Sequence, residues 1–334
     1  MTSLRRTVPA LALSASLIAM AGCATTVPGA GDTSDVDAAA PATRVVSTEQ
    51  GEVTIPADPE RIIVLNSNLA GYLFSLDVPV LATLPEEVGE VDPEYPEFWA
   101  DEATEAGTVI LPWSEDGFDF EALLELDPDL IIAGGQGFSA FQAVESYDRL
   151  TEVAPTVMVS SSLLTWQEQL DFIADDILDD AAGGAELLAA YDDRVAEVAA
   201  SITVPELPIA YLITTVDTPY SIPENAALPQ ALAELGFEPA TVIADNPGFE
   251  TYGTGDSFEL STEQLSTVFT APSMFVFPFF EGQGPTADDL KSDPLYSSLP
   301  AFQNDQVYEL PAWVYRADYL KSMAMLDEIE AQFG

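Results

Sequence analysis

The chain has 334 residues and a formal net charge of −48, with no histidine and a single cysteine. A field this negative excludes nucleic acid and anionic lipid as partners. Without histidine or a spare cysteine the chain lacks the ligands of zinc, copper or nickel sites and the Ser-His and Cys-His pairs of many hydrolases, so we expect neither an enzyme nor a resident metal or cofactor.

Lysine is rare: Lys291 and Lys321 are the only two. An acidic, lysine-poor surface is typical of a halophilic protein, because salt screens its self-repulsion. A secreted protein that is merely acidic is the alternative.

The N-terminus has the order of a signal peptide: Arg5 and Arg6, an apolar stretch over residues 8–21, then Gly22 and Cys23. The only cysteine follows small residues, and this resembles the lipobox of bacterial lipoproteins, which implies that Cys23 is lipidated. We expect a signal peptide over residues 1–23 and an extracytoplasmic protein held at the cell membrane by lipid. A plain secretion signal with an incidental cysteine is the alternative.

Residues 24–43 contain almost no large apolar side chains, so we expect a disordered tether. Beyond it, short continuous apolar runs alternate with helical segments, which predicts an α/β lobe over residues 44–180. The expected elements are strand 61–65, helix 69–76, strand 78–81, helix 120–126, strand 130–133, helix 138–150 and strand 156–159.

Residues 165–201 are helical in character, with a weak point at Gly183 and Gly184. We expect a long helix over residues 181–204 that bridges to a second α/β lobe over residues 205–334. Its expected elements are strand 209–213, helix 225–235, strand 241–243, helix 262–269, strand 274–277, strand 307–310 and helix 316–333. The predicted fold class is α/β, with two Rossmann-like lobes joined by one long bridging helix and a ligand cleft between them.

Two glutamates occupy matched places. Glu121 lies two residues after Asp119, and Glu263 two residues after Ser261, each at the start of a predicted helix. The helix dipole favours a carboxylate there by about 0.3 to 1 kcal/mol, which explains each glutamate singly. The repetition in both lobes suggests a functional role.

Several stretches together resemble the periplasmic-binding family for iron siderophores and cobalamin. They are residues 53–56, 59–65, 120–132, 154–157, 166–174, 260–265 and 293–308. The resemblance covers roughly residues 50–333, and it implies a substrate-binding protein that hands its ligand to an ABC permease. In that family a glutamate on each lobe docks to the permease, and the matching residues are Glu121 and Glu263.

The ligand should lie at the ends of the strands that face the cleft. The candidate ligand-binding residues on loops there are Trp113, Gln136, Tyr220, Tyr252, Phe280, Trp313 and Arg316. Any of these aromatic side chains can instead be ordinary core, and Trp166, inside a helical stretch, is expected to be core.

Charge narrows the ligand class. Only five arginines and two lysines follow the signal segment, so a cluster that holds a triply anionic catecholate is hard to assemble. A ferric siderophore of neutral hydroxamate type is favoured. Three other ligands remain as alternatives: cobalamin, haem and an oxygen-ligated free metal. Two other roles also remain, a receptor without a permease and a cell-envelope hydrolase with paired carboxylates. We expect a monomer whose lobes flex little, because a helix joins them.

Overall fold

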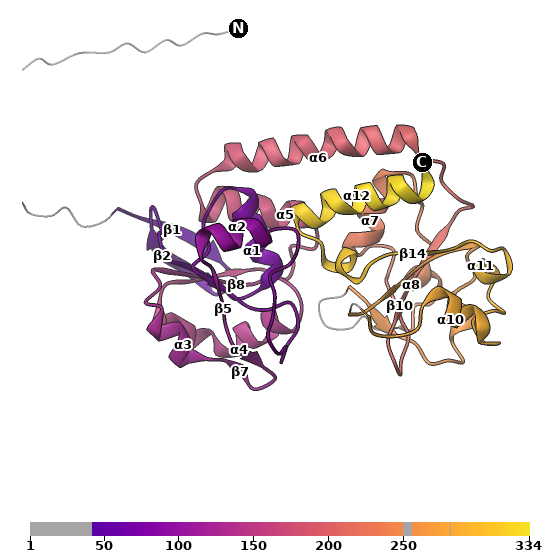
Figure 1. Ribbon diagram of the computed structural model, residues 1–334, viewed down its shortest axis with the longest axis horizontal. Coiled ribbons are helices and arrows are strands. Elements are labelled where there is room, and N and C mark those ends of the chain that lie inside the picture. The colour runs from indigo at the N-terminus through magenta and orange to yellow at the C-terminus, as the bar shows by residue number, and fades with distance from the viewer. Residues whose placement is uncertain (1–41, 250–255, 281) are drawn as a thin grey trace, which may run out of the picture. The chain divides into compact units, whose positions relative to one another are not determined.

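A computed structural model describes residues 42–249, 256–280 and 282–334 of the chain (Figure 1). The N-terminal lobe is built on a five-stranded parallel sheet in the order β5-β4-β3-β8-β9. Its elements are β1 (Thr43–Thr48), β2 (Gly51–Pro56), β3 (Ile62–Val64), α1 (Ser67–Ser75), β4 (Ala82–Thr83), α2 (Ala100–Ala106), β5 (Val109–Ile110), β6 (Trp113–Ser114), β7 (Gly117–Phe118), α3 (Phe120–Glu125), β8 (Leu130–Gly134), α4 (Phe138–Val153), β9 (Thr156–Val159), α5 (Trp166–Asp171) and the π-helical turn Phe172–Ile177. Every residue of β3, β8 and β9 is buried, as expected for parallel strands covered on both faces.

The C-terminal lobe has a second five-stranded sheet, in the order β12-β11-β10-β13-β14. The strands β10, β13 and β14 are parallel, and β11 and β12 are antiparallel to their neighbours. Its elements are β10 (Ile209–Thr214), β11 (Tyr220–Ser221), α7 (Ala227–Glu234), α8 (Val242–Asp245), β12 (Phe258–Glu259), α9 (Leu265–Val268), β13 (Ser273–Pro278), α10 (Ala287–Ser292), α11 (Pro300–Gln303), β14 (Val307–Glu309), the 3₁₀ turn Ala312–Arg316 and α12 (Tyr319–Phe333).

The long helix α6 (Ala181–Ser201) runs between the lobes, and the C-terminal helix α12 lies beside it (Figure 1). Arg194 of α6 pairs with Asp327 and Glu330 of α12 at 2.6 Å each. The start of α12 packs against the N-terminal lobe, where the rings of Tyr319 and Trp166 are 5.8 Å apart. Its last residues pack against the C-terminal lobe, so the lobes are connected by a pair of helices. The predicted α/β fold of two bridged lobes is confirmed.

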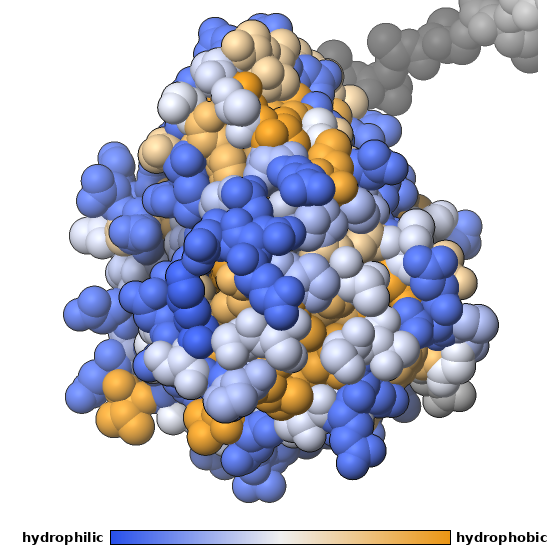
Figure 2. Space-filling view, turned by 90° about the vertical axis from the view of Figure 1, so that its right-hand side faces the viewer, coloured by the Kyte–Doolittle hydropathy of each residue, from blue (hydrophilic) through white to orange (hydrophobic). Residues whose placement is uncertain are grey.

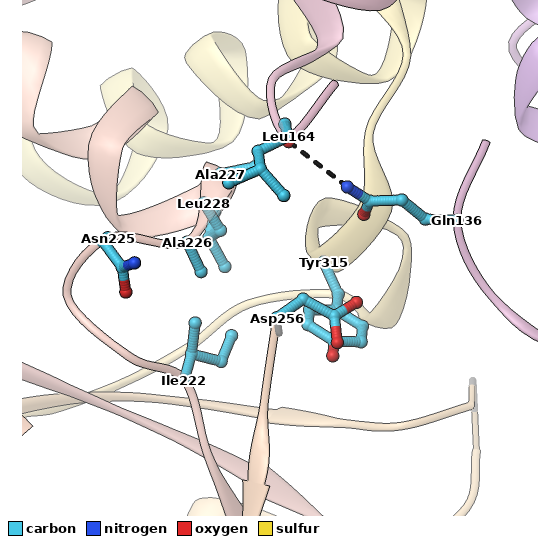
Figure 3. A pocket seen from close by; sticks show the side chains of 9 residues that line it. All are labelled: Gln136, Leu164, Ile222, Asn225, Ala226, Ala227, Leu228, Asp256 and Tyr315. Atoms are coloured by element: carbon cyan, nitrogen blue, oxygen red, sulfur yellow. Dashed lines mark hydrogen bonds between the residues drawn. The ribbon is translucent and has the colours of Figure 1, made fainter. Parts of the chain in front are cut away.

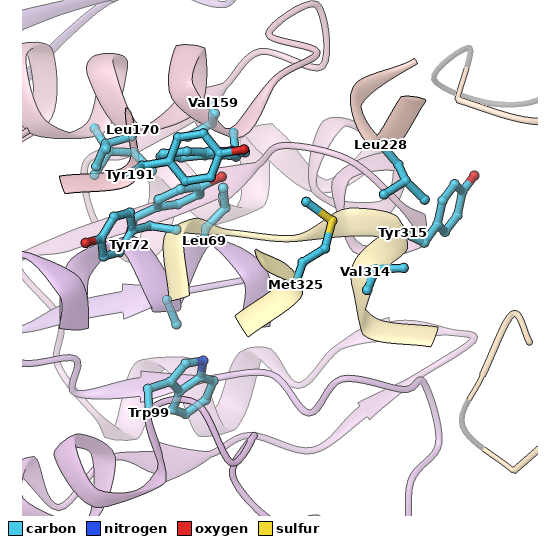
Figure 4. Packing of buried hydrophobic residues seen from close by; sticks show 14 of the residues in the cluster. Leu69, Tyr72, Trp99, Val159, Leu170, Tyr191, Leu228, Val314, Tyr315 and Met325 are labelled. Atoms are coloured by element: carbon cyan, nitrogen blue, oxygen red, sulfur yellow. The ribbon is translucent and has the colours of Figure 1, made fainter. Parts of the chain in front are cut away.

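One cluster of buried apolar side chains extends through both lobes (Figure 4). It includes Leu69 and Trp99 from the N-terminal lobe, Leu228 from the C-terminal lobe, and Met325 from α12. Two smaller clusters cover the other face of each sheet. Trp166 is 5 % exposed and belongs to the large cluster, as the sequence predicted.

Residues 241–243, predicted as a strand, are the N-cap and the first two residues of the short helix α8. The prediction is wrong because a contact distant in sequence stabilises the helix start. The carboxylate of Glu224 accepts hydrogen bonds from the N–H groups of Ile243 and Ala244, at 3.0 and 2.9 Å. These bonds satisfy amides that a helix N-terminus leaves without partners inside the helix.

Several other predicted elements differ at their boundaries. The bridging helix, expected over residues 181–204, ends at Ser201, where Ile202 takes an extended conformation. The expected strand 78–81 corresponds to β4, which begins at Ala82. The helix expected over 262–269 is limited to α9, and the helix expected from residue 316 begins only at Tyr319. Asp318 causes the later start, because its side chain accepts the Lys321 N–H and caps α12.

The surface reflects the acidic composition. Figure 2 looks onto the C-terminal lobe from its side and shows hydrophilic residues over much of that face, with apolar residues in smaller groups between them. Among the residues that the structure describes, no helix is long and apolar enough to cross a membrane.

Candidate functional site

Residues from both lobes meet at a cleft beyond the carboxyl ends of the central strands. Asn66 follows β3 and Gln136 follows β8, while Phe280 follows β13 and Arg316 follows β14. The Asn66 amide holds the first two loops together, because it donates to the carbonyl oxygens of Gly134 (2.9 Å) and Gln136 (3.1 Å). This is where open α/β sheets generally bind their ligands.

Arg316 occupies the centre of the cleft. Its Nε and Nη2 atoms donate to the same carboxylate oxygen of Asp256, at 3.0 and 2.8 Å. Burial lowers the pKa of the guanidinium, but Tyr315 and Asp256 more than offset this and leave the pKa above its ordinary value. Gly137 makes room for the arginine, since a Cβ at this residue would lie 3.1 Å from Nη1. Arg316 is therefore a fixed cation whose charge is already balanced.

Lys321 reaches the same cleft from α12. Its side chain is 4 % exposed, and its Nζ atom donates to Asn68 Oδ1 at 3.0 Å and pairs with the Glu86 carboxylate. Glu87 lies beside this pair, and burial, with the neighbouring Glu90 and Glu86 carboxylates, raises the pKa of Glu87. The second cation of the cleft is thus neutralised as well.

Aromatic side chains form the walls. Phe280 meets Phe279 edge to face with centroids 4.7 Å apart, and Trp313 meets Phe98 in the same way at 4.9 Å. Both Phe280 and Trp313 line a cavity of about 140 Å³ together with Arg316 and Lys321. Apolar rings beside a balanced pair of charges suit a ligand with an organic shell and little net charge.

Smaller cavities adjoin this one. Trp113, Gln136 and Arg316 border a space of about 60 Å³, and Gln136 and Arg316 also border one of about 30 Å³. A fourth, of about 20 Å³, is lined by Gln136, Asp256 and Tyr315 together with residues of the C-terminal lobe (Figure 3). There the Gln136 amide donates to the Leu164 carbonyl oxygen at 3.4 Å. Sites for drug-sized ligands usually measure about 300 to 1,000 Å³, so a chelate must rest largely in the open mouth or displace side chains.

The cleft therefore brings together five of the seven predicted ligand-binding residues: Trp113, Gln136, Phe280, Trp313 and Arg316. Tyr220 begins β11 and packs against Phe279 with centroids 6.4 Å apart, and it is not among the residues that line these cavities. Tyr252 and the lipidation candidate Cys23 lie outside the described residues.

The two predicted docking glutamates are exposed. Glu121 is in the first turn of α3, where the Asp119 side chain accepts the N–H groups of Glu121 and Ala122. Glu263 lies in the turn before α9, and there the Ser261 N–H donates to Gln264 Oε1 at 2.7 Å. Only the first glutamate sits on the capped helix start that the sequence predicted.

The sequence missed Asp256, Glu86, Asn68 and the cleft position of Lys321. Asn68 was visible as part of a polar run after a strand. Lys321 had no such signal, because the helix that carries it comes from the far end of the chain and packs against α1.

A larger cavity, about 380 Å³, lies in the C-terminal lobe beyond the ends of β13 and β14. Its lining is mostly apolar or backbone, and its one acidic side chain, Glu309, accepts the Ala287 N–H at 2.6 Å. Within the described part of the chain, no group of three or more acidic, histidine or cysteine side chains forms a metal-binding cluster.

Comparisons with known proteins agree with this architecture. The profile of the family "Periplasmic binding protein" matches residues 91–313. The ferric enterobactin-binding periplasmic protein FepB of Escherichia coli O6:H1 is 30 % identical over 297 residues, which cover 87 % of this chain and 91 % of that protein.

Two further proteins are more distant. The Fe(3+)-citrate-binding protein YfmC of Bacillus subtilis is 25 % identical over 269 residues, covering 80 % of this chain and 78 % of that protein. The crystal structure of holo-ViuP shares the fold, with a TM-score of 0.73 and 21 % identity over 87 % of this chain and 95 % of the other.

Proposed function

Because this chain belongs to the periplasmic binding protein family, we propose that it is the extracytoplasmic substrate-binding protein of an ABC importer and that its ligand is a ferric siderophore. Two relatives are named as binding proteins for ferric chelates, ferric enterobactin and Fe(3+)-citrate. The chain has no histidine, which supports iron that arrives already chelated.

Our choice of ligand class is based on the charge balance of the cleft. Among the described residues that line the cleft, the cations are Arg316 and Lys321. Arg316 is paired with the Asp256 carboxylate, and Lys321 with that of Glu86. Glu87 adds a further acidic group. A triply anionic chelate would meet at least as much negative as positive charge, whereas a neutral hydroxamate complex meets no net repulsion. We therefore favour a siderophore of the hydroxamate type.

Contacts in the cleft would recognise the chelate without changing it chemically. Trp313 and Phe280 can pack against the organic shell of the chelate, and Gln136 and Arg316 can donate hydrogen bonds to its oxygens. No step needs a nucleophile or a general base, so the proposed activity is binding and release.

The remaining proposals concern delivery. Residues 1–23 would be a signal peptide that leaves Cys23 lipidated, and residues 24–43 a tether to the membrane. Residues 44–180 and 205–334 would be the two lobes, joined by residues 181–204. Glu121 and Glu263 would dock to arginines of the permease, because an exposed carboxylate and a fixed guanidinium form a directional, charge-assisted pair.

Tryptophan fluorescence tests the ligand class. Trp99 and Trp166 are buried, whereas Trp113 and Trp313 line the cleft, so a bound chelate should quench the second pair. Residues 44–334 are titrated with a ferric tris-hydroxamate, a ferric tris-catecholate, cobalamin and haemin. We expect saturable quenching by the hydroxamate, reduced in Trp313→Phe and unchanged in Trp99→Phe.

Other results would redirect the proposal. Saturation by cobalamin or haemin alone would replace the iron siderophore as ligand. Preference for the catecholate would overturn the charge argument and leave the transport role standing. No response to any chelate, together with binding of a free ferric or calcium ion, would refute the siderophore assignment.

A further inference from the structure

An apolar strip runs along the exposed side of α4, starting at the cleft. It consists of Trp113, Phe138, Phe141 and Val144, and we call it the α4 shelf. The three helix residues are spaced three apart and are 43 %, 57 % and 55 % exposed. The ring of Phe138 lies 6.2 Å from that of Trp113 and 6.4 Å from that of Phe141, so the rings follow one another in a row.

Trp113, the inner end of the α4 shelf, is held in place by a buried amide. Its indole N–H donates to Gln142 Oε1 at 2.6 Å. The Nε2 of Gln142 donates to the carbonyl oxygens of Ser114 (3.1 Å) and Glu115 (3.0 Å), at the turn between β6 and β7. Gln142 is 5 % exposed, so these bonds form away from competing water. The hairpin that carries Trp113 is thereby fixed to α4.

The α4 shelf is continuous with the ligand site. Trp113 and Phe138 line the 60 Å³ cavity that also contains Gln136 and Arg316. From Phe138, which lines the cavity, the helix rises about 9 Å to Val144, and neither Phe141 nor Val144 lines the cavity. An apolar track therefore leads from the charge-balanced centre of the cleft to the outer surface.

The dimensions and charge of the α4 shelf indicate its occupant. A stable protein interface buries about 1,200 Å² or more in total, which a strip one side chain wide cannot supply. A second copy of this chain would bring another net charge of −48 against the first. A single alkyl chain fits a narrow linear track and adds no charge.

We propose that the α4 shelf binds an alkyl arm of the chelate, so that the preferred substrates are acylated, amphiphilic ferric chelates. This inference rests on the proposed function, because the arm is attached to the ferric head group in the cleft. The head would be recognised at Arg316 and Gln136, and the arm would lie over Trp113, Phe138 and Phe141.

Two probes with the same head and the same charge test the proposal. Ferric desferrioxamine is prepared with its terminal amine acylated by an acetyl or by an octanoyl group, and the dissociation constant of each is measured by calorimetry. The octanoyl form is expected to bind at least about tenfold more tightly to the unaltered protein, because each methylene removed from water adds to affinity.

The variant Phe141→Ser with Val144→Ser should bring this ratio close to one and leave the affinity for the acetyl form unchanged. Leu124→Ser is the matched control, since Leu124 is also helical and 58 % exposed but lies on α3. It should keep the full ratio.

Equal binding of the two probes by the unaltered protein would overturn the inference and leave the proposed function intact. A ratio that survives in the double variant would overturn it too. If neither probe binds, the proposed hydroxamate ligand fails and the inference fails with it.

Discussion

Replacing Asp256 by asparagine removes one of the carboxylates that balance the cleft and leaves Arg316 with a free positive charge. The replacement is nearly isosteric. The asparagine oxygen can take the place of Asp256 Oδ2 and accept both hydrogen bonds from the guanidinium, which measure 3.0 and 2.8 Å in the unaltered protein. The altered quantity is therefore charge and not shape.

The size of the effect follows from Coulomb's law. Two unit charges roughly 7 Å apart repel by about 1 to 2 kcal/mol at an effective dielectric constant of about 20 to 40. For a triply anionic ferric catecholate, Asp256→Asn should lower the dissociation constant by at least about tenfold, and the affinity for a neutral ferric hydroxamate should stay unchanged. Both hydrogen bonds lose the carboxylate charge that strengthens them, which should cost about 1 to 3 kcal/mol of folding free energy.

The assay is a pair of titrations at constant, low ionic strength, repeated in about 1 M salt, where a Debye length of about 3 Å should shrink the effect. Asp305→Asn is the matched control, because it makes the same change in net charge at the exposed pair with Lys291. An equal gain for both chelates, an equal gain in the control, or no gain for the anionic chelate would refute the charge-balance reasoning.

Three other predictions follow from the described contacts. Gly71→Ala should destabilise the protein by about 1 to 3 kcal/mol in urea unfolding, because a Cβ there would lie 2.0 Å from Asp318 Oδ2. Adding Asp318→Ala should recover much of this loss. Full stability of the single variant would contradict the close approach of Gly71 and Asp318. Burial raises the pKa of Asp318 above its unfolded value, despite the opposing effect of Lys321, so its contribution to stability is present at low pH and is lost as the pH rises through the folded-state pKa. Asp318→Asn should therefore gain stability relative to the unaltered protein as the pH rises above the unfolded-state pKa of about 4, and a difference independent of pH would be inconsistent with this. Glu121→Lys with Glu263→Lys should abolish uptake without changing ligand affinity, and uptake by this variant would rule out the docking proposal. Glu125→Lys, a charge reversal at the last residue of α3, is the control and should leave uptake intact.

The elements that could be predicted are those whose stability is local. Continuous apolar runs identified β3, β8, β10 and β13, because strands buried on both faces need apolar residues at every position. The helix α8 could not be predicted, since its first amides bond to the Glu224 carboxylate, about twenty residues earlier in the chain. The sequence shows that the segment is apolar, but it does not show that the Glu224 carboxylate bonds to its amides.

The same distinction applies to the site. Gln136, Phe280 and Arg316 were identifiable because each follows a recognisable strand, and the ends of parallel strands lie at one edge of a sheet. Asp256 and Lys321 were not, because their roles depend on contacts with Arg316 and with Glu86 that the order of residues does not reveal. Whether a basic residue can bind a ligand depends on the acidic residue with which it pairs in the folded protein.

The paired helices α6 and α12 also have a consequence for the kinetics of binding. The large apolar cluster passes through both lobes beside these helices, so a wide swing of the lobes would have to separate packed side chains. Ligand capture should then proceed in one step, with an observed rate that rises linearly with ligand concentration and reaches no plateau from a slow closing step. The lifetime of the complex would be set by dissociation of the ligand from a cleft that hardly moves. A permease that removes the ligand would have to supply the free energy needed to separate the lobes.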